Sequence, residues 1–196
     1  MTNAFNIIDA TPEDAPLIAW AIMEAVGEEL VDHLAGNKTR KDVEEIFTRL
    51  AGRTDSQYSY LNTRIAIAPD GTKAAICVSY DGGKLKELRR SFFAEANRVL
   101  RWGMTPEEVD ALPGETCGEE FYLDSLATLP HYRGQGAARI LIEDAARKAT
   151  AAGLPLGLLV ADHNPEARQL YESIGFRPVA RRPFAGEIMT NLRLPQ

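Results

Sequence analysis

The sequence predicts a mixed α/β fold, in which strands and amphipathic helices alternate along the chain. Three observations predict it. Residues 121–128 alternate like a half-buried strand, and an amphipathic helix follows from about 135 to 152. Residues 156–161 form an apolar run of strand length, of the kind that is buried on both faces of a sheet. Residues 63–68 and 73–80 read as two strands that a Pro-Asp-Gly turn joins into a hairpin.

The first fifty residues add a strand and two helices before this hairpin. Residues 5–8 read as a short strand. Thr11 has the features of a helix N-cap, because Pro12 and two acidic residues follow it. Apolar side chains then recur at helical spacing as far as Val26. A second helix is predicted from about 39 to 51, with its first threonine as the cap.

A long connection separates the hairpin from the strand at 121–128. Residues 81–118 are too many for a connection without secondary structure in a compact domain. A helix is predicted over 84–100, and Thr-Pro-Glu-Glu at 105–108 opens a short second helix. We therefore expect a helical insertion at about 81–118.

The segment HYRGQGAA at residues 131–138 joins the strand at 121–128 to the helix after it. Gly134 and Gly136 permit backbone geometries that a Cβ would hinder, and they let a ligand approach the main chain closely. The free N–H groups of the following helix, together with its dipole, make an anion site suited to a phosphate or pyrophosphate. The loop lacks the third glycine of a dinucleotide-binding fingerprint and the Gly-Lys-Ser/Thr of a Walker loop.

The segment after this helix contains clear helix boundaries. Gly153 closes the helix, and a proline two residues later prevents its continuation. After the strand at 156–161, Asn164 is a good N-cap and Pro165 suits the first position of another helix, which Gly175 ends. One face of that helix is apolar and carries Ala167, Leu170, Tyr171 and Ile174.

In this order and spacing, the chain resembles the GNAT superfamily of acyl-CoA-dependent N-acetyltransferases. The resemblance rests on the strand, the R-G-x-G-A loop, the helix, the buried strand and the pattern N-x-x-A-x-x-x-Y-x-x-x-G-F. It covers residues 119–194 closely and the first 118 loosely, and His131 departs from the usual Gln or Arg before the glycines. The resemblance implies one domain over 1–196, with a mostly antiparallel sheet of seven strands that splays between strands four and five.

The resemblance also implies catalytic candidates. An alkylamine has a pKa of about 10.4, so a base must remove a proton before it attacks a thioester. Glu120 occupies the place of the catalytic glutamate of histone-acetylating members, and Asp124 lies closer to the loop on the same face as Tyr122. Tyr171 matches the tyrosine that protonates the departing thiolate. Each has a structural alternative. Glu120 and Asp124 could be carboxylates that are hydrogen-bonded within the sheet or exposed at its end, and Tyr171 could be an aromatic ring that packs on the inner face of the last helix.

Acetyl-CoA is the implied co-substrate, bound largely by main-chain groups. Strand four would pair with the pantetheine amides and supply an N–H to the developing oxyanion. The loop would cradle the pyrophosphate, and Arg139 and Arg168 either reach the nucleotide phosphates or lie on helix surfaces. The candidate cofactor-binding residues are Leu126, Ala127, Thr128, Arg133, Gly134, Gln135, Gly136, Ala137, Ala138 and Asn164.

The insertion can be interpreted in two ways. Residues 104–124 carry seven acidic side chains and no basic ones. This charge either attracts a cationic amine to the acceptor site or belongs to a solvated surface of the kind that dimerisation could use. We favour the surface for the charges themselves. The insertion is nevertheless expected to shape the acceptor pocket, with walls from the first two helices and from residues 183–189.

Composition narrows the function classes. A net charge of −6 argues against nucleic-acid binding. Three scattered histidines predict no metal site, and Cys77 and Cys117 form no disulfide framework. No apolar run is long enough to span a membrane and no signal peptide is apparent, so we expect a cytoplasmic protein. The acceptor would be a small-molecule or peptide amine, with a hydroxyl or a protein N-terminus as alternatives, and a non-catalytic acyl-CoA-binding module as the competing class.

Overall fold

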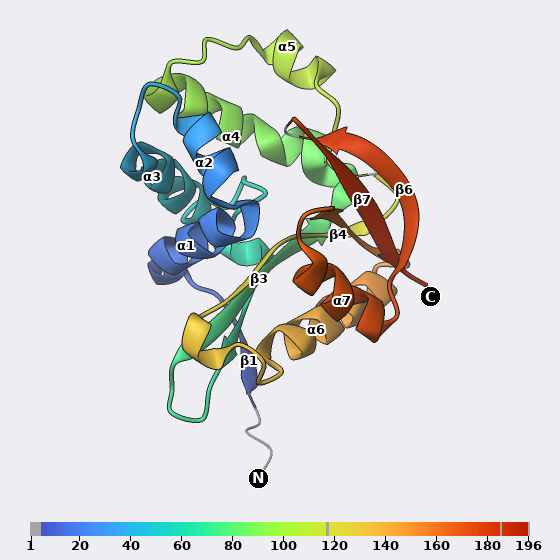
Figure 1. The fold of residues 1–196 in the computed structure, drawn as a ribbon. Helices are drawn as coiled ribbons and strands as arrows, with labels where there is room; N and C mark the ends of the chain where they lie inside the picture. Colours follow the sequence, from blue (N-terminus) through green and yellow to red (C-terminus); the bar gives the residue numbers. More distant parts are fainter. Residues whose placement is uncertain (1–4, 117, 185, 196) are drawn as a thin grey trace.

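The computed structural model describes residues 5–116, 118–184 and 186–195 (Figure 1). These residues form one seven-stranded sheet in the order β1-β2-β3-β4-β5-β7-β6. The strands are β1 (Asn6–Asp9), β2 (Thr63–Ile67), β3 (Lys73–Asp81), β4 (Phe121–Thr128), β5 (Leu156–Ala161), β6 (Arg177–Phe184) and β7 (Glu187–Leu194). Neighbouring strands are antiparallel, except that β4 and β5 are parallel. The predicted mixed α/β fold with a mostly antiparallel sheet of seven strands is confirmed.

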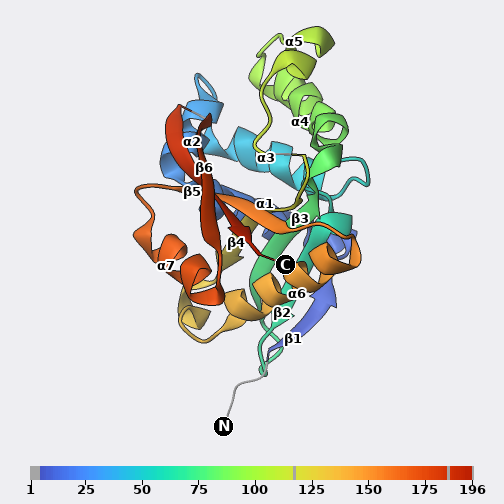
Figure 2. The ribbon, with the colours of Figure 1, turned by 90° about the vertical axis from the view of Figure 1, so that its right-hand side faces the viewer.

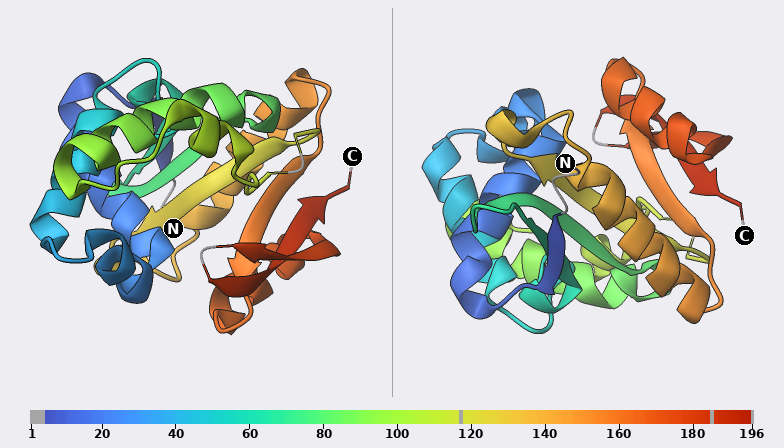
Figure 3. Two further views of the ribbon diagram at one scale, coloured as in Figure 1. Left: turned by 90° about the horizontal axis from the view of Figure 1, so that it is seen from above. Right: turned by 90° about the horizontal axis from the view of Figure 1, so that it is seen from below.

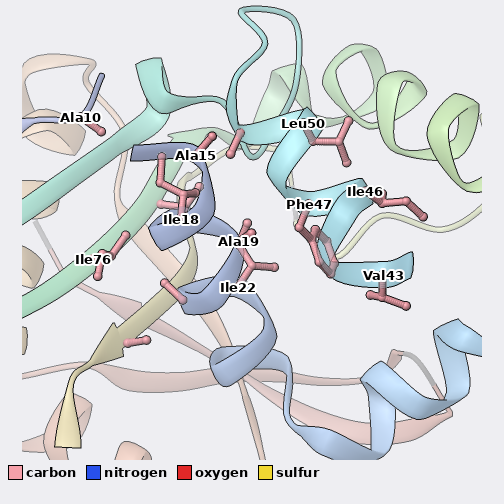
Figure 4. Close-up of a cluster of buried hydrophobic side chains, with 14 of the residues drawn as sticks. Ala10, Ala15, Ile18, Ala19, Ile22, Val43, Ile46, Phe47, Leu50 and Ile76 are labelled. Carbon is pink, nitrogen blue, oxygen red and sulfur yellow. The ribbon is translucent and has the colours of Figure 1, made fainter. Parts of the chain in front are cut away.

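Helices cover both faces of the sheet. They are α1 (Ala15–Val26), α2 (Glu28–Ala35), α3 (Arg40–Ala51), α4 (Leu85–Leu100), α5 (Pro106–Ala111), α6 (Ala137–Ala151) and α7 (Pro165–Ile174). Ile22 of α1 and Phe47 of α3 are fully buried in one hydrophobic cluster (Figure 4). A second cluster forms beneath α6. Strand β3 contributes to both, because successive residues point to opposite faces: Ile76 lies in the first cluster and Cys77 in the second.

The sheet splays between β4 and β5. These strands pair only through Phe121 with Leu156 and Tyr122 with Gly157, and then diverge. Figure 3 shows β4 (yellow) and β5 (orange) separating from this common point. Beyond Tyr122, the side of β4 that faces β5 has no paired strand. The predicted split between strands four and five is therefore present.

Local sequence signals account for most helix ends. Thr39 and Thr105 form capping boxes at the starts of α3 and α5, and Asn164 Oδ1 accepts a hydrogen bond from Ala167 N at 3.1 Å at the start of α7. The sequence predicted two helices before the hairpin, but the structure has three. Helix α2 was missed because it has only eight residues and no side-chain cap, and it lies between Gly27 and the C-terminal Gly36, both with positive φ.

The connection between β3 and β4 contains α4 and α5, as predicted. Both helices lie at the end of the molecule where α2 is found (Figures 1 and 2). Phe92 of α4 stacks on Phe47 of α3, with ring centroids 6.1 Å apart, so the insertion joins the first hydrophobic cluster. Within the described ranges, no helix is long and apolar enough to cross a membrane.

Candidate active site

A cleft of about 1370 Å³ opens where β4 and β5 diverge. Single-ligand pockets are usually about 300–1,000 Å³, so this cleft has room for two molecules. One part, the glycine-loop half, is lined by the end of β4, the loop before α6, and α7. The other part, the carboxyl half, is lined by the α1–α2 junction, Phe47 of α3, residues 57–58, α4, residues 112–115, Tyr122 and Asp124 of β4, and the β6–β7 hairpin. The two predicted N-terminal helices, the insertion and residues 183–189 thus all contribute to its walls.

The glycine loop has the geometry of an anion site. Gly134 and Gly136 have φ values of 72° and 93°, and a Cβ built on either would meet no atom within 4 Å. The first N–H of α6 to bond back along the chain is that of Ile140, which donates to Gly136 O at 3.2 Å. Within the described chain, the N–H groups from 134 to 139 have no hydrogen-bond partner, so they are available to an anion at the helix N-terminus.

The main chain of β4 borders this loop. Leu126, Ala127 and Thr128 all line the cleft. They pair with β3 on one side, and β5 has diverged on the other. The predicted main-chain contacts therefore lie on one continuous surface with the loop.

The arginines and the glutamine of the loop already have partners within the protein. Arg133 pairs with Glu24 of α1 at 2.7 Å and also donates to Thr128 O. Gln135 Nε2 donates to His131 O at 2.7 Å, and Gln135 is not among the lining residues. Arg139 lines the cleft and donates to a serine hydroxyl of α7. Arg168 pairs with Glu172 on the helix surface at 2.8 Å. The loop thus offers its main chain to a ligand more directly than these side chains.

Tyr171 lines the cleft from α7. It is 8% exposed, and its ring packs on Phe176 with centroids 5.6 Å apart. Its hydroxyl has no hydrogen-bond partner among the described residues, and burial raises its pKa. The phenol therefore stays protonated at neutral pH with its proton uncommitted. A packing role and a chemical role are both compatible with this placement, because Tyr171 lines the cleft and also belongs to the second hydrophobic cluster.

Asp124 reaches the cleft through an irregularity in β4. The pairing of β3 with β4 shifts between Val78 and Ser79, so that Asp124 is left unpaired opposite the shift. A bulge of this kind redirects a side chain. Asp124 Oδ2 accepts a hydrogen bond from the Tyr80 hydroxyl at 2.7 Å, and Oδ1 accepts one from Ser125 Oγ at 2.8 Å. Burial raises the pKa of Asp124 in spite of these bonds.

Glu120 lies in a different environment. It is fully buried and does not line the cleft. Its carboxylate lies over Gly157, where a Cβ would come within 2.1 Å of Oε2, and it pairs with Arg193 of β7 at 3.1 Å. The alternation along β4 does place it on the face of Tyr122, but it is at the closed end of the splay. The structure brings Asp124 and Tyr171 to the cleft and leaves Glu120 outside it.

Glu115 is a cleft residue that the sequence did not single out. It lies in the segment between α5 and β4, where Gln57 Nε2 donates to its Oε1 at 3.2 Å and the Tyr80 hydroxyl is 3.4 Å away. Burial and the charge of Asp124 raise the pKa of Glu115 to about 8. A weak signal was present, because Glu115 is one of seven acidic residues in 104–124, but that run has no periodicity to separate it from the others.

Two arginines hold this segment against the cleft. Arg89 of α4 is buried and donates to the carbonyl oxygens of Val109, Leu112 and Pro113 at 2.8–3.1 Å. From the other side, Arg182 of β6 donates to the carbonyl oxygens of residues 114–116, the closest at 3.2 Å. The insertion thus delivers a carboxyl group to the wall of the cleft. Among the residues that the structure describes, no group of three or more His, Cys, Asp or Glu could hold a metal ion.

Solved structures share this fold over nearly the whole chain. A crystal structure of an acetyltransferase is 23% identical with a TM-score of 0.74, and the match covers 96% of this chain and 98% of that one. An N-acetyltransferase from Staphylococcus aureus Mu50 is 21% identical with a TM-score of 0.76, covering 96% and 100%. At these identities the likeness establishes the fold. No match was found among curated proteins.

Residues 88–176 match the model of the Acetyltransferase (GNAT) family, a segment that contains the loop, α6, β5 and α7. This match covers less than half of the chain, and it agrees with the resemblance to the GNAT superfamily that the sequence implied. Acyl transfer is the general activity that this match supports.

Proposed function

We propose that this protein is an N-acetyltransferase that transfers the acetyl group of acetyl-CoA to a primary amine by direct attack in a ternary complex. The observation that carries the proposal is the continuity of the cleft. One end offers unpaired main-chain N–H groups to a pyrophosphate, the other offers the half-buried carboxyl groups of Glu115 and Asp124 to an amine, and Tyr171 lines the same cleft. An acyl donor and an acceptor bound at the two ends would meet beside Tyr171.

The residues present fit acetyl-CoA. The cradle at Gly134 and Gly136 is open in the direction where a Cβ would stand, and the N–H groups around it have no partner within the described chain. We assign the pyrophosphate to residues 133–138, with Asn164 holding the start of α7 beside them. Leu126, Ala127 and Thr128 would meet the pantetheine arm, and an N–H of this strand would stabilise the oxyanion.

The reaction balances without a covalent enzyme intermediate. The ammonium group of the acceptor first loses one proton, and its nitrogen then forms a bond to the thioester carbonyl carbon. The carbon–sulfur bond breaks, Tyr171 donates its proton to the thiolate, and the second amine proton restores the tyrosine through bound water. One acetamide, one free thiol and one released proton result. Asp124 is our choice as the first proton acceptor, because Glu120 would have to leave Arg193 to reach the cleft.

Calorimetric titration with acetyl-CoA, with NAD as the control, is the first test. Selective saturable binding of acetyl-CoA supports the proposal, and an amine screen by release of free thiol then follows. Thiol release that depends on an added amine separates an enzyme from a non-catalytic acyl-CoA-binding module. Binding without release under any amine would favour that module, and release with an alcohol or a peptide N-terminus would change the acceptor. No binding of acetyl-CoA at roughly millimolar concentration would refute the donor assignment.

A further inference from the structure

Two carboxyl groups in the cleft are joined by one phenol. The Tyr80 hydroxyl donates its single proton to Asp124 Oδ2 at 2.7 Å, and its oxygen lies 3.4 Å from Glu115 Oε1. Because the phenol proton is directed at Asp124, the contact with Glu115 is favourable when Glu115 carries a proton. Burial and the charge of Asp124 raise the pKa of Glu115 to about 8, in agreement with this arrangement. Near neutral pH Glu115 therefore keeps its proton, while the hydroxyl donors to both oxygens of Asp124 favour its carboxylate form.

A buried acceptor beside this pair has no partner in the protein. Gln57 is 4% exposed and lines the cleft. Its Nε2 donates to Glu115, whereas its Oε1 has no hydrogen-bond partner among the described residues. Either assignment of the amide leaves one polar atom of this side chain to be satisfied. An ammonium group, which has three donors, would supply the missing hydrogen bond and meet the negative charge of the pair.

The walls next to the pair are aromatic. The aromatic wall consists of Phe47, Tyr58, Phe92, Phe93 and Tyr122, which all line the carboxyl half of the cleft. Phe47 and Tyr58 meet edge to face with centroids 5.1 Å apart, and Phe92 and Phe93 do so at 5.3 Å. The charges of Asp124 and Glu115 contribute to a raised pKa of Tyr58, so this wall and the carboxyl pair are within electrostatic reach of each other. A flat apolar body would be well accommodated beside it.

The other charged groups around the pair are largely engaged. Arg89 donates to three carbonyl oxygens, and its charge opposes the rise in the pKa of Glu115 without cancelling it. At the rim, Glu24 pairs with Arg133 at 2.7 Å and Glu28 with Arg40 at 3.3 Å. Glu29, Glu166, Glu187 and His163 also line the cleft, and Glu187 and His163 lie 3.2 Å apart. Beside the aromatic wall, the carboxyl pair itself presents a single negative charge, which matches one ammonium group.

We infer that the acceptor is a monoamine carried on an aromatic or similarly flat apolar body, with its nitrogen held between Glu115 and Asp124 and its body against the aromatic wall. This inference rests on the proposed function and narrows its acceptor. On binding, the ammonium group takes the place of the Glu115 proton as the partner of that carboxyl group. Glu115 then releases that proton, and both carboxylates face the nitrogen. One of them, Asp124 in our assignment, can take the proton that the amine must lose before attack.

A comparison of acceptors tests the class of amine that the cleft accepts. Turnover is measured by thiol release with 2-phenylethylamine, n-butylamine, spermidine and a lysine-containing peptide, with 2-phenylethanol as the uncharged analogue. Burial of the ring should give 2-phenylethylamine a kcat/KM about 10- to 100-fold above that of n-butylamine. It should also exceed spermidine and the peptide, and 2-phenylethanol should give no product. A preference for spermidine or the peptide, with acetyl-CoA turned over, would overturn the inference and leave the proposed function intact.

Variants test the residues. Glu115→Gln and Asp124→Asn should each lower kcat/KM for 2-phenylethylamine by about tenfold or more, while acetyl-CoA binding is unchanged. Glu119→Gln is the matched control, because Glu119 is an exposed acidic neighbour that does not line the cleft. Phe92→Leu should lower kcat/KM for 2-phenylethylamine more than for n-butylamine. Equal losses in kcat/KM for both amines would show that the aromatic wall does not recognise the ring of the acceptor.

Proton release gives a readout independent of turnover. Calorimetric titration of 2-phenylethylamine near pH 7, in two buffers with different ionisation enthalpies, measures the protons exchanged on binding. We expect release of up to about one proton in the natural protein and little in Glu115→Gln. Unaltered proton release in Glu115→Gln would exclude Glu115 as the source of the released proton. Failure of acetyl-CoA itself to bind would instead overturn the proposed function.

Discussion

Replacement of Tyr171 by phenylalanine is the most direct test of the chemistry. The ring is 8% exposed and packs on Phe176, and both features survive the substitution. The hydroxyl has no hydrogen-bond partner among the described residues, so its removal loses no internal hydrogen bond. We expect the free energy of unfolding to change by no more than about 1 kcal/mol. Truncation to alanine would cost about 3–5 kcal/mol and would confuse the result.

The effect on turnover should be much larger than the effect on stability. Loss of a positioned general acid typically lowers a rate by about 10²- to 10⁴-fold, which corresponds to about 3–5 kcal/mol in the activation free energy. Because burial raises the pKa of Tyr171, the phenol is protonated over the whole range from about pH 6 to 9. The loss in kcat should therefore be constant across that range. Acetyl-CoA affinity should stay close to that of the natural protein.

The assay is thiol release at saturating acetyl-CoA and amine, with the affinity for acetyl-CoA measured by calorimetry. Tyr60→Phe is the control, because Tyr60 does not line the cleft. If kcat of Tyr171→Phe remains within about threefold of the natural protein, Tyr171 is not the acid. A loss that appears wholly in acetyl-CoA affinity would make Tyr171 a binding residue instead.

Three further substitutions test other parts of the structure. Gly134→Val should abolish acetyl-CoA binding by calorimetry, because its side chain would fill the space where the pyrophosphate is expected. The open surroundings should keep the chain folded, although a φ of 72° strains a valine and lowers the free energy of unfolding; acetyl-CoA binding by this variant would contradict the assignment of the loop. Gly157→Ala should lower the free energy of unfolding in urea by about 1–3 kcal/mol, because its Cβ would lie 2.1 Å from the Glu120 carboxylate; an unchanged midpoint would contradict the packing. The folded state holds a proton on Glu115 that the unfolded chain loses above its ordinary pKa of 4.5, so the free energy of unfolding should fall as pH rises from 4.5 to about 8. Glu115→Gln should flatten that dependence, and an unaltered slope would exclude the raised pKa.

The glycine-loop half of the site could be predicted from the sequence because its signals are local. Two glycines, an N-cap and an apolar stripe fix the loop, α6 and α7 within a few residues of their observed limits. The strand before the loop was equally clear, and Asp124 was a candidate by its position in it. That Asp124 faces the cleft through a shift in register was not predictable, since the shift depends on the pairing with β3.

The carboxyl half could not be read in the same way because long-range contacts build it. Glu115 faces Tyr80 of β3 and Gln57 of the loop before β2, at sequence separations of 35 and 58 residues. Its segment is held by Arg89 from one side and Arg182 from the other. No periodic pattern in the sequence predicts these long-range contacts. The sequence did favour a surface role for the acidic charges of the insertion, and for Glu115 the structure shows a cleft residue instead.

Two carboxyl groups four residues apart, Glu120 and Asp124, illustrate how the splay assigns different environments. Glu120 sits where β4 and β5 still pair, fully buried, and such a charge is tolerated only when it is paired, as it is with Arg193. Asp124 lies beyond the point of divergence, where β5 has withdrawn and the cleft begins. A carboxylate locked in an internal ion pair stabilises the junction of the strands but cannot exchange protons with a substrate. One that is hydrogen-bonded by a phenol and a serine at the cleft wall can do so, and this difference in surroundings is why we propose Asp124 rather than Glu120 as the proton acceptor.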